Sequence, residues 1–214
     1  MSEEQSFTLD GRRVPFQAGQ TLMAAALAAG VYIPHLCFNR EFAPHGSCRV
    51  CLVGVNGRMQ AACTTPAAAG QTVESETGEI REIRRGILQM LFVEGNHVCP
   101  ACEKSGACQL QAVAYYVGML APHYTHFYPR RPVDASHPEA VIDFNRCILC
   151  ELCVRVSRDV DGKNVFAVQG RGIEAHLVVN TPSGKLGASA FSMHAKAAQV
   201  CATGAILTQH RGYE

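Results

Sequence analysis

Apolar and polar residues alternate with a period of two near the start of the chain. The alternation continues on both sides of an Asp-Gly pair at residues 10–11, with apolar side chains at Phe7, Leu9, Val14 and Phe16. Because an Asp-Gly pair between alternating segments is typical of a two-residue turn, residues 6–16 are predicted to form a β-hairpin. A second hairpin is predicted to turn at Asn56-Gly57, between residues 52–55 and 59–62.

Helical spacing replaces this alternation in later segments. Thr21 can cap a helix that runs to Ala29 and ends before Gly30. In residues 79–94, apolar side chains recur every three or four positions opposite charged ones, which predicts a helix with one buried face. Residues 109–117 predict another, shorter helix.

The C-terminal part begins with a stretch that prolines interrupt. Residues 122–138 contain four prolines and are predicted to form an extended connector. Beyond it, residues 164–168 and 173–179 resemble a pair of strands, and residues 189–200 predict a helix. The pattern predicts an α+β chain in three parts, residues 1–76, 77–120 and 121–214.

Charge and hydropathy exclude two classes of partner. The net charge is +1 and basic residues form only short pairs, so the chain lacks the basic stripe that nucleic-acid binding requires. The longest apolar run, residues 22–33, is too short to span a bilayer. The N-terminal sequence MSEEQSFT carries two acids where a signal peptide carries positive charge, so we expect a cytoplasmic protein.

The chain contains eleven cysteines. The cytosol keeps thiols reduced and the number is odd, so disulfides are a poor explanation for them. We therefore expect the cysteines to bind metal. They fall into three spaced groups, which leaves no cysteine as a nucleophile for covalent catalysis.

The first group has the spacing Cys37-x10-Cys48-x2-Cys51-x11-Cys63. A close pair of thiolates on a loop, with two distant thiolates on neighbouring loops, is the form expected of a [2Fe-2S] site with four cysteine ligands. The first gap is longer than in plant-type ferredoxins. A tetrahedral zinc site is the alternative, although zinc sites usually contain two CxxC pairs.

The second group, Cys99-x2-Cys102-x5-Cys108, supplies three cysteines and needs a fourth ligand. His97 lies two residues upstream and is the natural candidate for a [4Fe-4S] site, because histidine replaces cysteine in some iron–sulfur centres. The alternative is that His97 is an ordinary histidine beside a site completed by an external ligand. His123 and His126 are the other candidates, and we interpret the remaining histidines as ordinary.

The third group, Cys147-x2-Cys150-x2-Cys153, has the spacing that wraps three corners of a [4Fe-4S] cluster in one loop. In bacterial ferredoxins the run continues to a fourth cysteine that serves another cluster, and here that position is Ser157. The last corner then requires a distant cysteine, and Cys201 is the one that remains. Zinc is again the alternative metal.

The number of predicted ligands equals the number that three clusters need. Eleven cysteines and His97 make twelve ligands, which is four for each cluster.

The sequence Gly170-x-Gly172-x-x-Ala175 matches the glycine pattern of dinucleotide-binding proteins. That motif requires a helix directly after it and an acidic residue about twenty positions further along the chain. Here a strand-like segment follows, and the acidic residue is missing. We interpret this motif as a glycine-rich turn, and expect no flavin or substrate site in this chain.

The order of the three groups resembles a known electron-transfer module. It is similar to the N-terminal part of two kinds of protein, the large peripheral-arm subunit of complex I and some [FeFe]-hydrogenases. It is also similar to the diaphorase small subunit of NAD-reducing [NiFe]-hydrogenases. The resemblance covers nearly the whole chain. It implies a β-grasp [2Fe-2S] domain in residues 1–76, a helical, histidine-ligated [4Fe-4S] segment in residues 77–120 and a single-cluster ferredoxin-like [4Fe-4S] domain in residues 121–214.

Details of the motifs favour the hydrogenase branch, the HoxU type. Complex I members carry their histidine where this chain has Gly95, whereas the hydrogenase branch is similar to GNHVCPACEKSGACQLQ with its histidine at His97. The chain of 214 residues is also shorter than complex I and [FeFe] members, which continue into large domains. It departs from the family at Ser157, where many relatives keep further cysteines, and at Cys201-Ala202, where Cys-Pro is usual.

The resemblance implies an electron relay that catalyses no reaction alone. A partner subunit would bind FMN and NAD, and partners forming the small and large [NiFe]-hydrogenase subunits would convert H₂. A relay in an NAD-dependent formate dehydrogenase or complex I-like enzyme is the alternative within this class. A zinc-stabilised interaction scaffold and a cluster-based redox sensor are alternatives from other classes, although no DNA-binding element is recognised for the latter.

Overall fold

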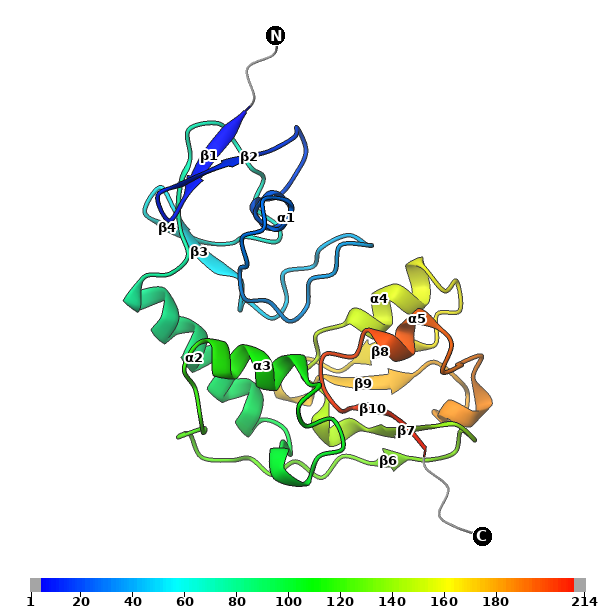
Figure 1. Ribbon diagram of the computed structural model, residues 1–214. Coiled ribbons are helices and arrows are strands. Elements are labelled where there is room, and N and C mark those ends of the chain that lie inside the picture. Colours follow the sequence, from blue (N-terminus) through cyan, green and yellow to red (C-terminus); the bar gives the residue numbers. More distant parts are fainter. Residues whose placement is uncertain (1–4, 210–214) are drawn as a thin grey trace. The chain divides into compact units, whose positions relative to one another are not determined.

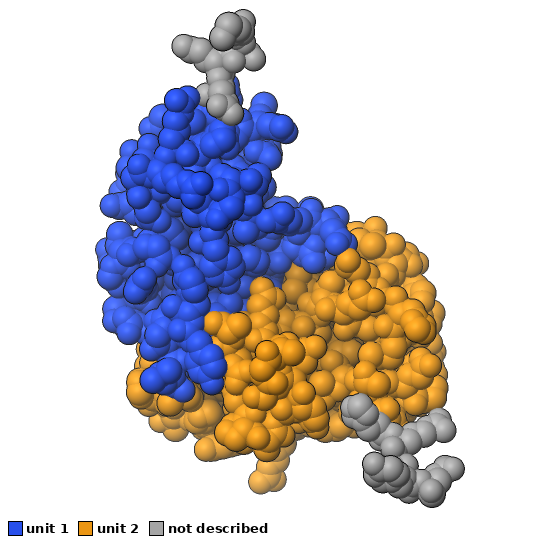
Figure 2. Space-filling model, in the orientation of Figure 1, with its two compact units in different colours: residues 1–88, 113–120 blue, residues 89–112, 121–214 orange. Residues whose placement is uncertain are grey.

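The protein folds into two compact units (Figures 1 and 2). The computed structural model describes residues 5–209. Unit 1 comprises residues 1–88 and 113–120, and unit 2 comprises residues 89–112 and 121–214. The acidic residues of the N-terminus and His210 lie outside the described residues.

Unit 1 contains a mixed sheet of five strands in the order β2-β1-β5-β3-β4 (Figure 1). The strands are β1 (Ser6–Leu9), β2 (Arg12–Pro15), β3 (Leu52–Val55), β4 (Arg58–Ala61) and β5 (Thr72–Glu74). Strands β1 and β5 are parallel, and the other neighbours are antiparallel.

Both predicted hairpins of unit 1 are confirmed. Strands β1 and β2 turn at Asp10-Gly11, and β3 and β4 turn at Asn56-Gly57. Both residues of each turn have positive φ, between 48° and 79°, which is the backbone that Asp, Asn and Gly adopt most readily. The short-range turn signal therefore sets the register of these strands.

Helix α1 (Leu22–Ala28) lies between the hairpins in sequence and confirms the predicted cap. The Thr21 hydroxyl accepts a hydrogen bond from the Ala24 N–H at 3.2 Å, and Gly30 continues the chain at a φ of 72°. The buried face of the helix shares one hydrophobic core with the sheet, formed by residues such as Phe7, Leu9, Val14, Leu22, Met23, Val53 and Val73.

Two further predicted helices are also confirmed. Helix α2 spans Gly78–Val93, and helix α3 spans Gln109–Tyr116. Ile80 and Leu88 on α2 are buried, whereas Arg81 and Glu82 on its opposite side are exposed. The predicted apolar stripe is thus partly confirmed, because Ile83 and Ile87 are only half-buried, and Arg84, predicted on the charged side, is fully buried.

Unit 2 contains two small sheets and two short helices. Strands β6 (Val133–Asp134), β7 (Ala140–Asp143) and β10 (Ile206–Thr208) form a sheet in the order β10-β7-β6. Strands β8 (Phe166–Gln169) and β9 (His176–Val179) form an antiparallel pair. The helices are α4 (Leu152–Asp159) and α5 (Lys196–Gln199).

The structure corrects two predicted elements of unit 2. The strand predicted for residues 173–179 begins only at His176, because Gly172–Glu174 forms a 3₁₀ turn. The helix predicted for residues 189–200 is wrong except for α5, because the Ser189 and Ser192 hydroxyls accept hydrogen bonds from backbone N–H groups two residues later. Such side-chain bonds give the backbone an alternative to helix.

The other predictions for unit 2 agree with the structure. Residues 122–138 are irregular apart from β6, as expected of a proline-rich connector. The motif at residues 170–175 is a turn that leads into β9 rather than a helix, and Gly170 and Gly172 both have positive φ. Within residues 5–209, no helix combines the length and apolar character needed to cross a bilayer.

Candidate metal centres

The four cysteines of the first group meet in unit 1. Cys37, Cys48 and Cys51 lie on the irregular segment between α1 and β3, and Cys63 follows β4. All four are buried, with at most 9% of each residue exposed. The Cys48 N–H donates to the Cys37 Sγ at 3.5 Å, so this segment folds back on itself and brings residues 11 positions apart into contact at the Cys37 sulfur.

Hydrogen bonds link the thiols of this group. Hydrogen bonds from the Cys48 and Cys63 thiols lower the pKa of Cys37, and a hydrogen bond from Cys63 lowers that of Cys51. The same contacts raise the pKa values of Cys48 and Cys63. The four sulfur donors therefore lie near one another in a buried part of unit 1, as four thiolate ligands of one cluster require.

A buried arginine holds the loop that carries Cys51. Arg84 on α2 is fully buried, and it donates hydrogen bonds to the carbonyl oxygens of Val50 and Leu52, at 3.1 and 2.8 Å. Those two carbonyls flank Cys51. Burial lowers the pKa of Arg84, which shows that its charge is held at a cost in solvation. The sequence reasoning did not identify this residue, because its helical position alone indicates a solvent-facing charge.

The three cysteines of the second group lie together in unit 2. Cys99 and Cys102 stand at either end of a 3₁₀ turn, and Cys108 directly precedes α3. Burial raises the pKa values of Cys99 and Cys108. The Gln111 side chain supports their loop by accepting a hydrogen bond from the Gly106 N–H at 2.8 Å.

His97 lines the same pocket as these three cysteines. Its Nε2 atom is buried and has no hydrogen-bond partner, whereas buried polar atoms normally have one. Burial lowers the pKa of His97 to about 4, so the imidazole is neutral at pH 7 and can offer a lone pair. The ring lies against Gly95, where a Cβ atom would come within 2.6 Å of Nε2.

The other candidate histidines do not line this pocket. His123 is exposed, and its backbone N–H donates to the Gln89 side chain. The His126 ring stacks on Tyr128 with a centroid distance of 5.3 Å. His97 is therefore the histidine that the fold places beside the second group of cysteines.

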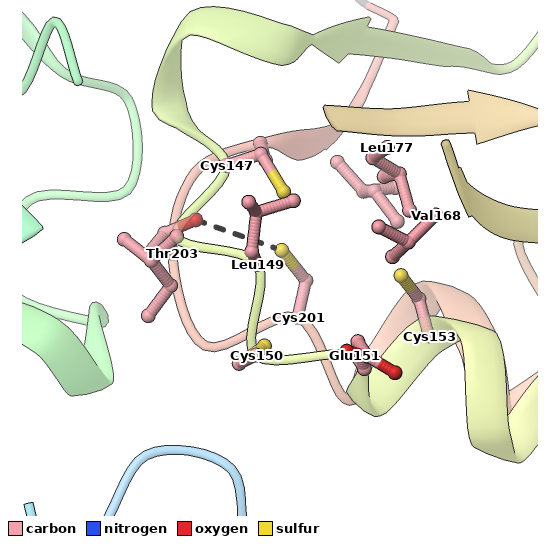
Figure 3. A pocket seen from close by; sticks show the side chains of 12 residues that line it. Cys147, Leu149, Cys150, Glu151, Cys153, Val168, Leu177, Cys201 and Thr203 are labelled. Atoms are coloured by element: carbon pink, nitrogen blue, oxygen red, sulfur yellow. Dashed lines mark hydrogen bonds between the residues drawn. The ribbon is translucent and has the colours of Figure 1, made fainter. Parts of the chain in front are cut away.

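All four cysteines of the third group line another pocket of unit 2 (Figure 3). Cys147, Cys150 and Cys153 come from one loop, which ends in the first turn of α4. Leu149 and Glu151 on this loop have φ values of 51° and 57°, an unusual conformation for these residue types that bends the chain between successive cysteines. Burial raises the pKa of Cys147 to about 11 and also raises that of Cys153.

Cys201 joins this pocket from a segment that follows α5 (Figure 3). Its Sγ lies 3.8 Å from the Thr203 hydroxyl. The departure at Cys201-Ala202 leaves the thiol in place, and the Ala202 carbonyl accepts a hydrogen bond from the Leu110 N–H at 3.2 Å. The loop is thus anchored without the proline that is usual in the family.

Ser157 has a different role from the cysteine expected at its position. It is fully buried, and its hydroxyl accepts a hydrogen bond from the Val165 N–H at 2.8 Å. Its carbonyl oxygen also accepts from the N–H groups of Lys163 and Asn164. Ser157 therefore connects α4 to the segment that leads into β8.

Within residues 5–209, no three His, Cys, Asp or Glu side chains gather closely enough to hold a single ion. A cluster distributes its protein ligands over several irons, so its ligands surround a larger space.

Two other residues beside the second group were not identified from the sequence. Arg146 directly precedes Cys147, yet its side chain extends to the Cys102 sulfur. Gly204 lies where a Cβ atom would be 3.2 Å from the same sulfur. Neither residue belongs to a metal-binding motif, so no local signal could have indicated these contacts.

Three family models match successive parts of the chain. A 2Fe-2S iron-sulfur cluster binding domain matches residues 2–78, and the iron-sulfur binding region of NADH-ubiquinone oxidoreductase-G matches residues 84–123. The ferredoxin-like domain of NADH-quinone oxidoreductase subunit 3 matches residues 138–207. The chain therefore contains [2Fe-2S]-binding and [4Fe-4S]-binding domains.

Individual relatives extend this similarity. The gamma subunit of the NAD-reducing hydrogenase HoxS from Cupriavidus necator is 38% identical over 208 residues, which cover 97% of this chain and 88% of the relative. The alpha subunit of NADPH-Fe(3+) oxidoreductase from Geobacter sulfurreducens is 34% identical over 206 residues, 95% of this chain and 24% of that protein.

A solved structure agrees with these sequences. A chain in the crystal structure of NAD⁺-reducing [NiFe]-hydrogenase in the H₂-reduced state is 51% identical, covers 98% of this chain and 89% of its own length, and superposes with a TM-score of 0.94. The resemblance read from the cysteine spacing is confirmed. The chain belongs to the family of the gamma subunit of NAD-reducing hydrogenase.

Proposed function

We propose that this chain is an electron relay with three iron–sulfur clusters. The observation that carries the proposal is the gathering of all eleven cysteines into three separate groups, with an unpartnered buried imidazole nitrogen in the one group that has three cysteines. Iron–sulfur clusters of the types matched here need four protein ligands each. The three groups with His97 meet that requirement.

The proposed ligand sets follow the groups. One [2Fe-2S] cluster and two [4Fe-4S] clusters would be held, respectively, by Cys37, Cys48, Cys51 and Cys63; by His97, Cys99, Cys102 and Cys108; and by Cys147, Cys150, Cys153 and Cys201. The contacts between the four thiols of unit 1 support the first set. The pocket shared by four cysteines of unit 2 supports the third.

The second set depends on His97. Its buried Nε2 lacks a partner, and a neutral imidazole can bind iron through such a nitrogen. A neutral ligand in place of a thiolate makes the cluster one charge less negative. The proposed histidine ligand should therefore raise the reduction potential of this cluster relative to one with four cysteines.

The domain types form part of the same proposal. The parallel pairing of β1 with β5, inside the order β2-β1-β5-β3-β4, supports a β-grasp domain around the [2Fe-2S] site. The 3₁₀ turn and α3 around the second group support a helical [4Fe-4S] segment. The single complete set of four cysteines in the C-terminal part supports a ferredoxin-like domain with one cluster.

The partners are inferred from the relatives. Subunits of an NAD-reducing hydrogenase would flank this chain, with FMN and NAD on one partner and the [NiFe] site on others. A hydride carries two electrons whereas each cluster accepts one, so the chain would pass electrons singly between those centres. Its residues would fix and tune the clusters, and no bond-making step would belong to it. We place this complex in the cytoplasm.

Metal analysis of the native complex tests this proposal. Anaerobic purification with the partner subunits should give about ten irons for this chain, from cluster types that hold two, four and four. Nickel in the complex would support a hydrogenase, whereas molybdenum would identify a formate dehydrogenase. Stoichiometric zinc without visible absorption would overturn the relay.

Paired histidine variants test the second ligand set. His97→Ala should alter the electron paramagnetic resonance (EPR) signal of one [4Fe-4S] cluster and leave the other two clusters unchanged. His123→Ala is the matched control, because His123 is exposed in the same unit. If only His123→Ala changed a cluster signal, the ligand role would move to that residue.

A further inference from the structure

Arg146 contacts a sulfur atom of the second group. Its Nη1 atom lies 3.5 Å from the Cys102 Sγ and lines the pocket that contains His97, Cys99 and Cys108. An N–H group at this distance from sulfur donates a hydrogen bond to it. The contact joins residues 44 positions apart in the sequence, so the fold of unit 2 produces it.

Two carboxylates hold the guanidinium in this position. The Arg146 Nε atom lies 2.8 Å from the Asp143 Oδ2, and Nη1 lies 2.7 Å from the Glu103 Oε2. The Thr203 hydroxyl also donates a hydrogen bond to the Arg146 carbonyl at 2.8 Å. Because its guanidinium and its backbone carbonyl are both held by these contacts, and only 20% of its side chain is exposed, Arg146 is a rigid donor.

Gly204 also packs closely against the Cys102 sulfur. A Cβ atom at Gly204 would lie 3.2 Å from the Cys102 Sγ and 3.5 Å from the Arg146 Nη1. The absent side chain lets the backbone of residue 204 approach the sulfur and the guanidinium together.

We propose that Arg146 raises the reduction potential of the histidine-ligated cluster by donating its Nη1–H to the Cys102 sulfur. Hydrogen bonds and positive charge at a ligand sulfur stabilise the more negative, reduced cluster. The inference rests on the proposed function, because it takes Cys102 as a ligand of that cluster. Arg146 acts through Cys102 and is therefore a positioning and tuning residue.

Arg146 should raise the reduction potential of only one of the two clusters proposed for unit 2. The Arg146 side chain lines the pocket of the second group, but it is not among the residues that line the pocket of the third group. The backbone of Arg146 adjoins Cys147, whereas the charge and the donor point to Cys102.

A redox titration of the assembled complex, followed by EPR, tests this role. In Arg146→Met the second cluster should become harder to reduce. At a given applied potential, its ratio of reduced to oxidised form should fall about tenfold, which corresponds to a midpoint potential lower by about 59 mV for one electron. Arg146→Lys should give an intermediate potential, because it keeps the charge but loses the guanidinium geometry. Arg158→Met is the matched control, since Arg158 is exposed and pairs with Asp159 on α4.

The outcomes separate this inference from the proposed function. If the wild-type complex lacked the signal of a histidine-ligated cluster, the ligand set itself would be wrong. If all signals were present and Arg146→Met moved no potential, or moved both [4Fe-4S] potentials equally, the tuning role would be overturned. Should Arg146→Met fail to assemble iron, Arg146→Lys decides, and a wild-type potential in that variant would refute the proposal.

Discussion

Replacement of Arg84 by methionine tests how the [2Fe-2S] loop of unit 1 is held. Arg84 is fully buried on α2, and its hydrogen bonds reach the segments on either side of Cys51. Methionine keeps an unbranched side chain but removes the donors and the charge. The change should therefore act on the loop that carries Cys48 and Cys51, while most apolar contacts of α2 remain.

The magnitude follows from the contacts that are lost. Arg84 donates to the Val50, Leu52 and Ser75 carbonyls at 2.8–3.1 Å, and to the Ser75 hydroxyl at 2.9 Å. Each hydrogen bond from a charged donor contributes about 1.5–3 kcal/mol, but part of that gain offsets the solvation that the buried cation loses. Each buried carbonyl oxygen left without its donor costs about 1–3 kcal/mol, so the loss of these partners should cost about 3–5 kcal/mol in total.

Urea titration of the iron-loaded complex measures this cost. The EPR signal of the [2Fe-2S] cluster should disappear at a urea concentration about 1.5–2.5 M lower in Arg84→Met, if m is about 2 kcal/mol/M. Arg81→Met is the control, because the Arg81 side chain is 52% exposed on the same helix. A surface ion pair contributes about 0–1 kcal/mol, so its midpoint should move by less than about 0.5 M. Equal midpoints for the two variants would show that Arg84 does not hold the loop.

Further predictions concern unit 2 and the assembled protein. Cys201→Ser should remove one [4Fe-4S] signal and about four irons, whereas Ser157→Ala should keep every cluster and lower stability by about 1–3 kcal/mol, because it leaves a buried N–H unpaired. Iron loss in the serine-to-alanine variant would contradict this assignment. Gly95→Ala should change the EPR signal of the second cluster, since its Cβ would be 2.6 Å from the His97 Nε2, and Gly78→Ala, which has open space around it, should not. Removal of iron by a chelator should lower the thermal unfolding midpoint measured by circular dichroism, because cluster binding is coupled to folding; an unchanged midpoint would contradict that coupling.

Local sequence signals predicted most elements of unit 1. The turns at residues 10–11 and 56–57 and the Thr21 cap depend on side chains within a few positions of each other, so their patterns were sufficient. Strand β5 was missed because it has only three residues and is stabilised by pairing with β1 and β3, which are distant in sequence. Strands β6 and β10 were also missed, since they have only two and three residues, and so was β7, which has four residues and pairs with both.

The predicted helix at residues 189–200 shows the limit of propensity. Its alanine-rich sequence suits a helix, but the serine hydroxyls at residues 189 and 192 bond to the backbone instead. Helix α4 was also missed, since the cysteines at its start obscure the helical pattern of residues 152–159. In both places the tertiary environment decides between two local alternatives.

The amino-acid sequence by itself determined the three groups of cysteines and the family, because ligands that share a loop are separated by a few residues whose spacing can be counted. It also predicted Cys201 for the third group and His97 for the second, and the tertiary structure places both beside those groups. Only the tertiary structure showed that Arg84 and Arg146 contact cysteine-bearing loops. The contacts of the two arginines with these loops join residues 32 to 44 positions apart. They arise from the packing of the whole chain, which no local pattern of residues records.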